Sequence, residues 1–582
     1  MVNLKIDGRP IAVEPGTTVL EAAKQLGIKI PTLCYLKEIN KIGACRMCLV
    51  EATGTRGLQT SCTLPCAEGM EVGTNTSKVK DARKLVLDLL LSDHNIACPT
   101  CVRADNCELL RLSRDAGIMG APREGVHHPE RIDITSASLA LDASKCVLCQ
   151  RCVAVCREVQ GVSAISLINR GFHSGITPFF ESTLDEAACT YCGQCTLVCP
   201  TGALTEHDNT AEVWAALGDP SKHVIVQTAP AVRVAIGETC GLPAGTVSTG
   251  QMVAALRAMG FDQVFDTNFA ADVTIMEEAS ELVERITHGG VLPMITSCSP
   301  GWVKYAEHFY PDRLQHLSSC KSPHEMLGAL AKSYYAEQYG IDPASIIVVS
   351  VMPCTAKKFE ASRPELAGTG YPDVDLVITT RELGRMIRQA NLDLTLLPDE
   401  HFDAPLGISS GAGAIFGTTG GVMEAALRTA AAWLEGDEVG RLEFTEVRGL
   451  EGVREATVKV GALELKVALA NGLASAGRLM DKVATGASGY HFIEIMGCPG
   501  GCIGGGGQPI PAEGPEGLER VRRARIKAIY AIDQNSAVRR SHENPAVVAL
   551  YQDFLGRPLG ETSHHLLHTH YVRRSPSGGD RS

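Results

Sequence analysis

The sequence predicts a multidomain chain of α/β and α+β class, with small cysteine-rich modules ahead of a larger α/β domain. Three observations support this fold class. The chain has 582 residues, which is too long for one hydrophobic core. Most of its 22 cysteines stand before residue 210, in groups with short, fixed gaps. From about residue 221, short apolar stretches alternate with stretches of helical periodicity, the pattern of an α/β fold.

The composition narrows the class of protein. With 45% hydrophobic and 21% charged residues, the chain resembles ordinary globular proteins. A net charge of −12 argues against nucleic-acid binding and gives no reason to expect adhesion to an anionic membrane. The start, MVNLKIDGRP, lacks the basic and apolar parts of a secretory signal, and no run of 18 apolar residues occurs. We therefore expect a cytoplasmic protein whose clustered cysteines bind metal rather than form disulfides.

Residues 1–78 predict a small β-rich domain. The stretch VNLKIDGRPIAV alternates around Asp7-Gly8, which indicates a hairpin, and GTTVLEAAKQLG indicates a helix that ends at Gly27. Four cysteines follow as C-x10-C-x2-C-x13-C, which differs from the plant-type ferredoxin spacing in the first gap. We predict a β-grasp [2Fe–2S] domain, with zinc or structural cysteines as the alternatives, and Cys66 as a packed thiol. The ligands would be Cys34, Cys45, Cys48 and Cys62.

Residues 79–120 begin with helical periodicity and continue into HNIACPTCVRADNC. One imidazole and three thiolates can bind zinc or an iron–sulfur cluster. The position between two iron–sulfur domains favours a [4Fe–4S] cluster. A neutral histidine ligand should raise its potential relative to four cysteines. The ligands would be His94, Cys98, Cys101 and Cys107.

Residues 137–210 contain an internal duplication. CVLCQRCVAVC and CTYCGQCTLVCP both follow C-x2-C-x2-C-x3-C, the run of two-cluster ferredoxins, in which the fourth cysteine of each run binds the other cluster. A zinc interpretation would require eight thiolates to divide differently. We predict two [4Fe–4S] clusters, one on Cys146, Cys149, Cys152 and Cys199, the other on Cys189, Cys192, Cys195 and Cys156. Four clusters in succession would conduct electrons towards a terminal site.

Residues 221–510 predict an α/β domain in which three strand-like runs end in cysteine. They are VLPMITSCSPGW, with a strand expected from Val291 to Ile295, SIIVVSVMPCTAKKFE and HFIEIMGCPGGCIGGGGQP. In α/β sheets ligands gather at the carboxyl ends of strands, so these loops can converge. Any one of them alone would be better interpreted as a buried thiol. Together they indicate a site formed by Cys298, Cys354, Cys498 and Cys502.

The motifs TSCSPGW, MPCTAKKFE and EIMGCPGGCIGGGGQP resemble the three signature loops of [FeFe]-hydrogenases, and the similarity extends over essentially the whole chain. The order of modules resembles the catalytic subunit of multi-subunit, NAD(P)-linked hydrogenases, including electron-bifurcating ones. The resemblance implies an H-cluster, a [4Fe–4S] cubane joined to a di-iron unit carrying CO, cyanide and azadithiolate, and the reaction 2H⁺ + 2e⁻ ⇌ H₂. It also implies flavin/NAD(P)-binding and thioredoxin-like [2Fe–2S] partner subunits, with ferredoxin as a further candidate. No dinucleotide or Walker A motif is present in this chain, so those cofactors would belong to the partners.

The resemblance assigns roles to residues of these loops. It implies that the cubane is bound by Cys354, Cys498 and Cys502, with Cys502 bridging to the di-iron unit. Lys357 would hold one cyanide through a charge-assisted hydrogen bond, and the loop of Ala229, Pro230 and Ala231 would offer backbone donors to the other. Met352, Met496, Pro323 and His324 would surround the inorganic unit.

A proton path is implied in the same way. IMEEASELVER places Glu278, Glu281 and Arg285 on one helical face, which without the resemblance would be interpreted as a solvated surface. In the family a relay runs from a cysteine through two glutamates and a serine. The matching positions here are Cys298, Glu278, Ser318 and Glu281, with Arg285 at the mouth.

One position departs from the family, whose loop reads Thr-Ser-Cys-Cys-Pro. The first cysteine of that loop is the proton relay and the second a cubane ligand, so an ungapped match puts Cys298 on the relay and Ser299 on the ligand. The loop could instead shift so that Cys298 becomes the ligand, Ser299 could bind iron through oxygen, or one cubane iron could be weakly held. We favour Cys298 staying near the di-iron unit.

Residues 511–582 are charged and helical and resemble the small subunit of the family, fused here to the C-terminus. The His-rich SHHLLHTHY is expected to pack on the catalytic domain. Cys240 and Cys320 match no ligand position. Two rival functions are a low-turnover hydrogen sensor and a non-catalytic electron-transfer protein, because the first 210 residues also resemble the iron–sulfur subunit of respiratory complex I.

Overall fold

The expected N-terminal hairpin opens a small mixed sheet. β1 (Val2–Ile6) pairs antiparallel with β2 (Arg9–Val13), and the turn places Asp7 and Gly8 at positive φ. β5 (Glu71–Gly73) joins β1 in parallel, and β3 (Leu49–Ala52) and β4 (Gln59–Thr60) complete the order β2-β1-β5-β3-β4. α1 (Val19–Gln25) begins at Thr18, whose hydroxyl accepts a hydrogen bond from Glu21 N. The predicted β-grasp domain is confirmed.

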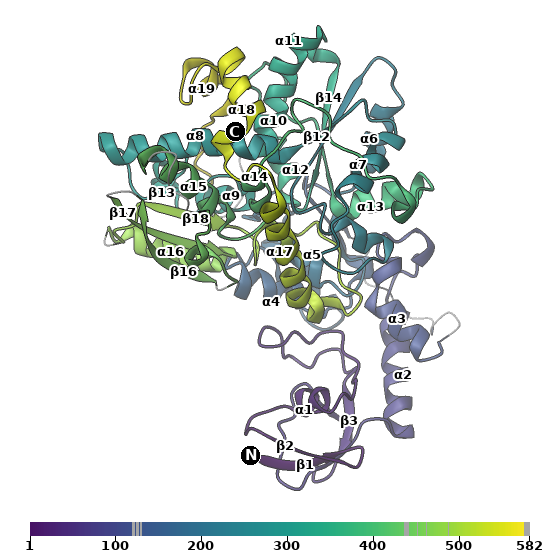
Figure 1. Ribbon diagram of the computed structural model, residues 1–582. Coiled ribbons are helices and arrows are strands. Elements are labelled where there is room, and N and C mark those ends of the chain that lie inside the picture. The colour runs from purple at the N-terminus through teal and green to yellow at the C-terminus, as the bar shows by residue number, and fades with distance from the viewer. Residues whose placement is uncertain are drawn as a thin grey trace.

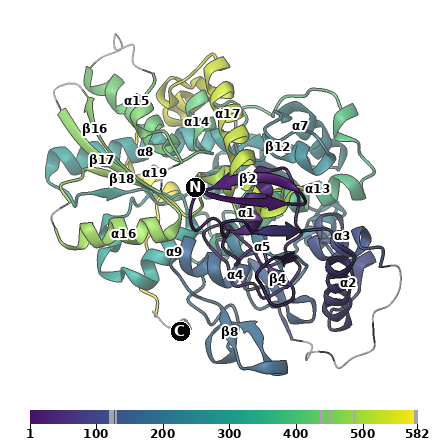
Figure 2. The same cartoon turned by 90° about the horizontal axis from the view of Figure 1, so that it is seen from below.

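The structure is a computed structural model that describes residues 1–118, 123, 127, 131–435, 442–450, 452–460, 463–486 and 488–575. The N-terminal domain lies at one end of the molecule, at the bottom of Figure 1, and faces the viewer in Figure 2. α2 (Ser77–Ser92) and α3 (Glu108–Asp115) connect it to the rest of the molecule.

The duplicated cysteine runs have the same backbone geometry. Leu148 and Tyr191, each two residues after the first cysteine, have φ of 52° and 56°, and Gln150 and Gly193, each four residues after it, have φ of 59° and 65°. Gln150 and Gly193 are the N-cap residues of α4 (Arg151–Ala154) and α5 (Gln194–Val198). This part of the chain also forms two small sheets: β10 (Leu204–Glu206), β7 (Leu139–Asp142) and β6 (Ile132–Asp133) form one, and β8 (Ser166–Ile168) and β9 (Gly175–Thr177) the other.

The largest domain contains two four-stranded sheets. The first is fully parallel, in the order β12-β11-β14-β15, and contains β11 (His223–Thr228), β12 (Gln263–Asp266), β14 (Ile346–Met352) and β15 (Leu376–Thr379). Its core includes residues from α6 (Thr210–Leu217), α7 (Thr249–Ala258), α8 (Thr267–His288), α10 (Pro323–Leu330), α11 (Ala336–Tyr339) and α13 (Thr380–Gln389). This sheet confirms the α/β class expected from the sequence.

The second sheet has the order β13-β18-β17-β16. β13 (Met294–Ile295), β18 (Phe492–Met496) and β17 (Leu463–Asn471) are parallel, and β16 (Val453–Val460) forms an antiparallel hairpin with β17. The helices of this half are α9 (Pro300–Phe309), α14 (Gly411–Ile415), α15 (Gly421–Glu435) and α16 (Leu473–Ala484), and α12 (Ala356–Glu360) follows β14. The cysteine loops therefore come from both sheets.

One expected strand is wrong in length. The run Val291–Ile295 forms only the two-residue strand β13, and Val291 is exposed. Pro293 has no N–H and cannot donate to the ladder, so pairing starts at Met294, whose N–H donates to His491 O at 2.9 Å.

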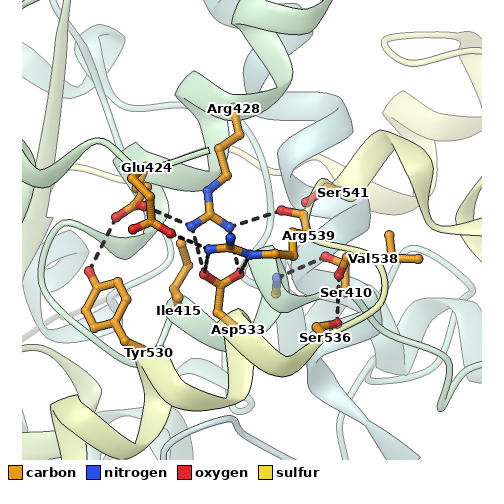
Figure 3. A network of polar contacts seen from close by, with 12 residues as sticks. Ser410, Ile415, Glu424, Arg428, Tyr530, Asp533, Ser536, Val538, Arg539 and Ser541 are labelled. Carbon is orange, nitrogen blue, oxygen red and sulfur yellow. Dashed lines mark hydrogen bonds and ion pairs between the residues drawn. The ribbon is translucent and has the colours of Figure 1, made fainter. Parts of the chain in front are cut away.

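The C-terminal region is helical, as expected, and packs on the large domain through α17 (Leu518–Asn535), α18 (Pro545–Leu550) and α19 (Glu561–Leu567). A buried ion network fastens it: Arg428 on α15 pairs with Asp533 on α17 at 2.7 Å and with Glu424 at 2.8 Å (Figure 3). Leu566 and Leu567 enter the core of the first sheet. Within the described ranges, none of the helices has both the length and the apolar character needed to span a bilayer.

Candidate functional site

The four cysteines of the first domain lie together as two pairs of buried thiols. The sulfurs of Cys48 and Cys62 are 3.3 Å apart. The Cys34 thiol lowers the pKa of Cys45 to about 6, and the Cys62 thiol lowers that of Cys48 to about 7. Two adjacent thiol pairs suit two irons, each held by two cysteines. Cys66 is a buried thiol of the domain core, as expected.

The residues of the His94 set (His94, Cys98, Cys101 and Cys107) lie against the segment that contains the two ferredoxin-like cysteine runs. His94 Nδ1 is buried and has no hydrogen-bond partner among the described residues, which suits a metal ligand. Cys107 Sγ accepts a hydrogen bond from Leu110 N at 3.4 Å, and burial, with Cys101 as a minor neighbour, raises its pKa. Cys101 N donates to Cys98 O at 3.3 Å.

The sulfurs around Cys152 and Cys195 agree with the crossed pattern, which stays a prediction. Burial, and then neighbouring sulfurs, raises the pKa of Cys152 and Cys195 well above the ordinary thiol value. After burial, the thiols that raise the pKa of Cys152 most are Cys149, Cys146 and Cys199. Those that raise the pKa of Cys195 most are Cys192, Cys189 and Cys156. The second set lines a single cavity. Thiols with such raised pKa values stay protonated unless a metal cation displaces the protons.

The site formed by Cys156, Cys189, Cys192 and Cys195 contacts the cysteine loops of the large domain. Thr355 Oγ1, next to Cys354, donates to Tyr191 O at 2.6 Å, and Gln194 Nε2 donates to Gly504 O at 2.9 Å. A Cβ on Gly506 would lie 2.4 Å from Cys192 O, so only glycine fits there. The glycine-rich loop thus lets the two sites approach closely.

The strand-end loops converge on one cavity with a mainly apolar lining. The residues expected from the sequence that line it are Ala229, Pro230, Cys298, Pro323, His324, Met352, Cys354, Lys357 and Cys502. Thr267, Ala271, Pro353 and Phe416 also line it, and sequence reasoning missed them as site residues. Phe416 lies in the glycine-rich stretch GAGAIFGTTGG, and Ala271 lies seven residues before Glu278 on α8, a helical spacing that could have indicated it.

Four expected residues lie around this cavity rather than in its lining. Cys498 is 8% exposed, and burial, followed by the neighbouring sulfurs of Cys354, Cys192 and Cys502, raises its pKa well above the ordinary thiol value. Ala231 and Met496 are buried in the neighbouring core. The fourth is Ser299.

Ser299 and Cys298 face different partners. Ser299 Oγ accepts a hydrogen bond from Gly497 N at 3.1 Å, which places it against the loop that carries Cys498. Cys298 faces the cavity, and after burial the largest influence on its pKa is the charge of Glu278. These contacts agree with the ungapped match, which stays a prediction.

Lys357 is a buried cation at the edge of the cavity. Its Nζ lies 2.6 Å from Glu360 Oε2 and donates to Cys298 O at 3.3 Å. His324 Nε2 lies 2.7 Å from the same Glu360 oxygen. Burial alone would raise the pKa of Glu360, but Lys357 and His324 outweigh it and lower this pKa to about 2. A fixed ammonium ion beside an apolar, thiol-lined cavity suits an anionic metal complex that carries cyanide.

The expected relay residues form a row that starts at the cavity. Glu278 is fully buried, and burial followed by the charge of Glu281 raises its pKa to about 8. Neither of its oxygens makes a short hydrogen bond to a described residue, and Ser318 and Ser297 are its polar neighbours. Ser318 Oγ donates to Glu281 Oε2 at 2.8 Å, and Arg285 Nη2 donates to Glu281 Oε1 at 2.5 Å.

Five family models match consecutive parts of the chain. The iron-only hydrogenase large subunit, C-terminal domain, matches residues 222–506, and the iron hydrogenase small subunit matches 519–574. The other three are a 2Fe-2S iron-sulfur cluster binding domain at 1–77, an NADH-ubiquinone oxidoreductase-G iron-sulfur binding region at 83–121, and an NADH-quinone oxidoreductase subunit 3 ferredoxin-like domain at 136–205.

Relatives match over nearly the full length. The NADP-reducing hydrogenase subunit HndD of Solidesulfovibrio fructosivorans is 50% identical, over 99% of both chains. Iron hydrogenase 1 of Clostridium pasteurianum is 42% identical, over 98% of this chain and 100% of the other. An apo structure of a variant of the [FeFe]-hydrogenase HydA1 from Chlamydomonas reinhardtii is 44% identical and covers 63% of this chain and 99% of its own, with a TM-score of 0.56. This chain belongs to the iron-only, or [FeFe]-, hydrogenases, a family of iron–sulfur oxidoreductases.

Proposed function

We propose that this chain catalyses 2H⁺ + 2e⁻ ⇌ H₂ at an H-cluster held by Cys354, Cys498 and Cys502. The observation that carries this proposal is the cavity where strand-end thiols and a buried ammonium ion meet, directly beside the Cys156–Cys189–Cys192–Cys195 site. The H-cluster, when bound, supplies the metal at which protons and electrons combine. The protein residues orient it, exclude water and deliver protons.

Lys357 would hold one cyanide, because Glu360 keeps its ammonium ion charged in a buried position. The backbone of Ala229, Pro230 and Ala231 would approach the other cyanide. Met352, Met496, Pro323 and His324 would exclude water around the unit. An apolar wall with one fixed cation gives a charged complex a single orientation.

Protons would move between the cavity and the surface through Cys298, Glu278, Ser318 and Glu281, with Arg285 at the outlet. A carboxyl group with a pKa near 8 can both accept and release a proton near neutral pH, so Glu278 suits the central place. Ser318 can pass a proton on, because its hydroxyl both donates and accepts.

Ser299 would take the fourth cubane position, next to the Cys498 loop, while Cys298 serves the relay. A hydroxyl is a harder ligand than a thiolate, so one cubane iron would be bound through oxygen or held weakly. This chain would then differ from the family in the electronic properties of its cubane.

Electrons would travel through one [2Fe–2S] and three [4Fe–4S] clusters on the predicted ligand sets. Asn40 Nδ2 donates both to Cys34 O at 2.7 Å and to Cys149 O at 3.0 Å, so the first and third sites share a direct bridge. The domains would end at residues 78, 120, 210 and 510, as expected from the sequence.

We further propose that the chain works in a complex with flavin/NAD(P)-binding and thioredoxin-like [2Fe–2S] subunits, with ferredoxin as a further electron carrier. The support is the end-to-end match to an NADP-reducing hydrogenase subunit and the two modules similar to NADH oxidoreductase subunits. A cytoplasmic location remains the prediction made from the sequence, and co-purification from fractionated cells tests both statements.

The decisive experiment is infrared spectroscopy of the chain produced together with the maturation proteins. Bands of metal-bound CO and cyanide together with rapid H₂ turnover are expected. Iron content that accounts only for the four N-terminal clusters, with no such bands, contradicts the proposal and leaves the electron-transfer alternative. Intact bands with very low turnover would instead favour the sensor.

A further inference from the structure

The loop that carries Cys498 and Cys502 packs against α17 of the C-terminal region. Arg525 Nη1 on this helix donates a hydrogen bond to Ile503 O, in the loop itself, at 2.8 Å. The same guanidinium group donates to both carboxylate oxygens of Glu238, each at 2.8 Å. Arg525 therefore fastens α17 to the cysteine loop, and its charge is compensated by a carboxylate.

Arg522, one turn earlier on α17, lies over the glycines of the same loop. A Cβ on Gly504 would lie 2.9 Å from Arg522 Nε, and a Cβ on Gly500 would lie 3.7 Å from Arg522 Cδ. Gly500 follows Cys498 by two residues, and Gly504 follows Cys502 by two. Because glycine has no side chain, the arginine approaches the backbone beside both proposed cubane ligands.

The positive charge of Arg522 is not compensated in the way that the charge of Arg525 is. Arg522 forms no ion pair with a residue that the structure describes, and its buried Nε has no hydrogen-bond partner among them. Glu519, one turn before it, pairs instead with Arg523 at 2.7 Å, where both side chains are exposed. Burial lowers the pKa of Arg522, and the charge of Cys498 is the largest influence that opposes this. Because a guanidinium group stays charged at neutral pH, a cubane ligand supplies the main negative charge acting on Arg522.

A cation in this position suits the proposed cubane. A [4Fe–4S] core bound by thiolates carries a net negative charge, and net charge is one of the properties that set the potential of an iron–sulfur cluster. Reduction moves one electron from the Cys156–Cys189–Cys192–Cys195 cluster to the cubane, which becomes more negative. A fixed positive charge stabilises the reduced form more than the oxidised form, and the effect is strong where little water screens it. The charge of Arg522 therefore favours reduction of the cubane.

Two rival interpretations assign no redox role to Arg522. Its stem could cover the glycines while the charged end is hydrated, as in many long cationic side chains. The buried Nε argues against this, because it belongs to the charged group itself. Alternatively, the guanidinium group could fasten the loop, but the backbone hydrogen bonds that Arg525 makes have no counterpart for Arg522 among the described residues.

We propose that Arg522 positions a fixed positive charge beside the active site and thereby raises the reduction potential of the cubane held by Cys354, Cys498 and Cys502. The C-terminal region then does more than pack on the catalytic domain, since one of its helices adjusts the electron affinity of the active site. The inference rests on the proposed function, because it requires the cubane on these cysteines. It concerns charge alone, so it does not depend on whether Ser299 binds iron.

The test compares Arg522→Gln, Arg522→Lys and Arg523→Gln in fully matured protein. Arg523 is the neighbouring, exposed arginine on α17 and serves as the matched control. A redox titration followed by electron paramagnetic resonance should show a lower cubane potential in Arg522→Gln, because the cation is lost. Arg522→Lys, which keeps the charge, and Arg523→Gln should titrate close to the parent. All three variants should keep the [2Fe–2S] signal, the iron content, and the CO and cyanide bands.

A cubane potential in Arg522→Gln equal to that of the parent would overturn the proposal and show that solvent screens this charge. A shift of the same size in Arg522→Lys, or loss of cubane iron in both variants, would overturn it in favour of a structural role for the guanidinium group. Failure of the proposed function is distinguishable, because the parent itself would then lack the CO and cyanide bands, whereas failure of this inference appears in variants of a parent that has them.

Discussion

Ser299 Oγ lies 3.1 Å from Gly497 N, directly before the first cysteine of the GCPGGC motif. The neighbouring Cys298 points into the cavity instead. These two adjacent residues, in the loop between β13 and α9, thus face different partners.

Ser299→Cys should add a thiolate at the fourth cubane position. Because thiolate is a softer and more strongly donating ligand than a hydroxyl group, we expect the cubane potential to fall and its electron paramagnetic resonance signal to change. The measurement is a redox titration followed by that signal, with Cys240→Ser as control. An unchanged cubane signal would mean that residue 299 does not contact the iron.

Glu278→Gln should reduce H₂ turnover by at least about a hundredfold, because the amide cannot pass a proton from Cys298 to Ser318. The clusters should be retained, so the infrared bands should match those of the parent. The control is Glu284→Gln, an exposed glutamate on the same helix. Near-parental turnover with Glu278→Gln would remove Glu278 from the proton path.

The same substitution should also change how stability depends on pH. Burial raises the pKa of Glu278 from an ordinary 4.5 to about 8, so the folded state binds the proton more tightly than the unfolded state. Ionisation in the folded state is therefore unfavourable: the cost is absent below pH of about 4.5, grows as pH rises, and is complete above pH of about 8. It amounts to a few kcal/mol at most.

Glu278→Gln removes this cost, so the variant should gain stability relative to the parent as pH rises from 5 to about 8. Thermal unfolding of both proteins at several pH values measures the difference. A constant difference across this range would show that Glu278 titrates normally in the folded state.

Much of the site could be predicted from the sequence because its ligands are local. The first three thiols of each ferredoxin-like run, such as Cys189, Cys192 and Cys195, are separated by two residues, and the backbone between them fixes their approach. The helical spacing of Glu278, Glu281 and Arg285 likewise predicted a shared face, which α8 provides.

The parts of the fold and of the site that could not be predicted depend on contacts between segments far apart in the sequence, which periodicity does not reveal. The pair of Glu277 and His568 joins residues 291 positions apart, and the pattern around His568 looked like an ordinary packed terminus. The short length of β13 followed from the missing N–H of Pro293, which an apolar pattern conceals. The arrangement of the cysteine loops on two sheets required knowledge of strand order.

Lys357→Met should impair retention of the di-iron unit while leaving the cubane in place. The substitution preserves length but removes the buried cation and leaves Glu360 with His324 as its remaining charged partner. We expect weak or absent CO and cyanide bands with a cubane signal close to that of the parent. Lys459→Met, on the exposed side of β16, is the control. Full-strength cyanide bands at parental frequencies would exclude a bond from Lys357 to cyanide.

Asp533→Ala should destabilise the attachment of the C-terminal region. Asp533 is fully buried and pairs with Arg428 and Arg539, so its removal leaves the buried Arg428 guanidinium with Glu424 as its remaining acidic partner among the described residues. Breaking a buried ion pair from one side costs about 3–5 kcal/mol, because the remaining charge stays desolvated. Limited proteolysis should therefore cleave near α17 faster than in the parent, and the thermal midpoint should fall.

The matched control is Asp312→Ala, which breaks the exposed pair with Arg573 and should change stability by less than about 1 kcal/mol. Equal protease sensitivity of the two variants would mean that the core contacts of Leu566 and Leu567, rather than the ion network, hold this region in place.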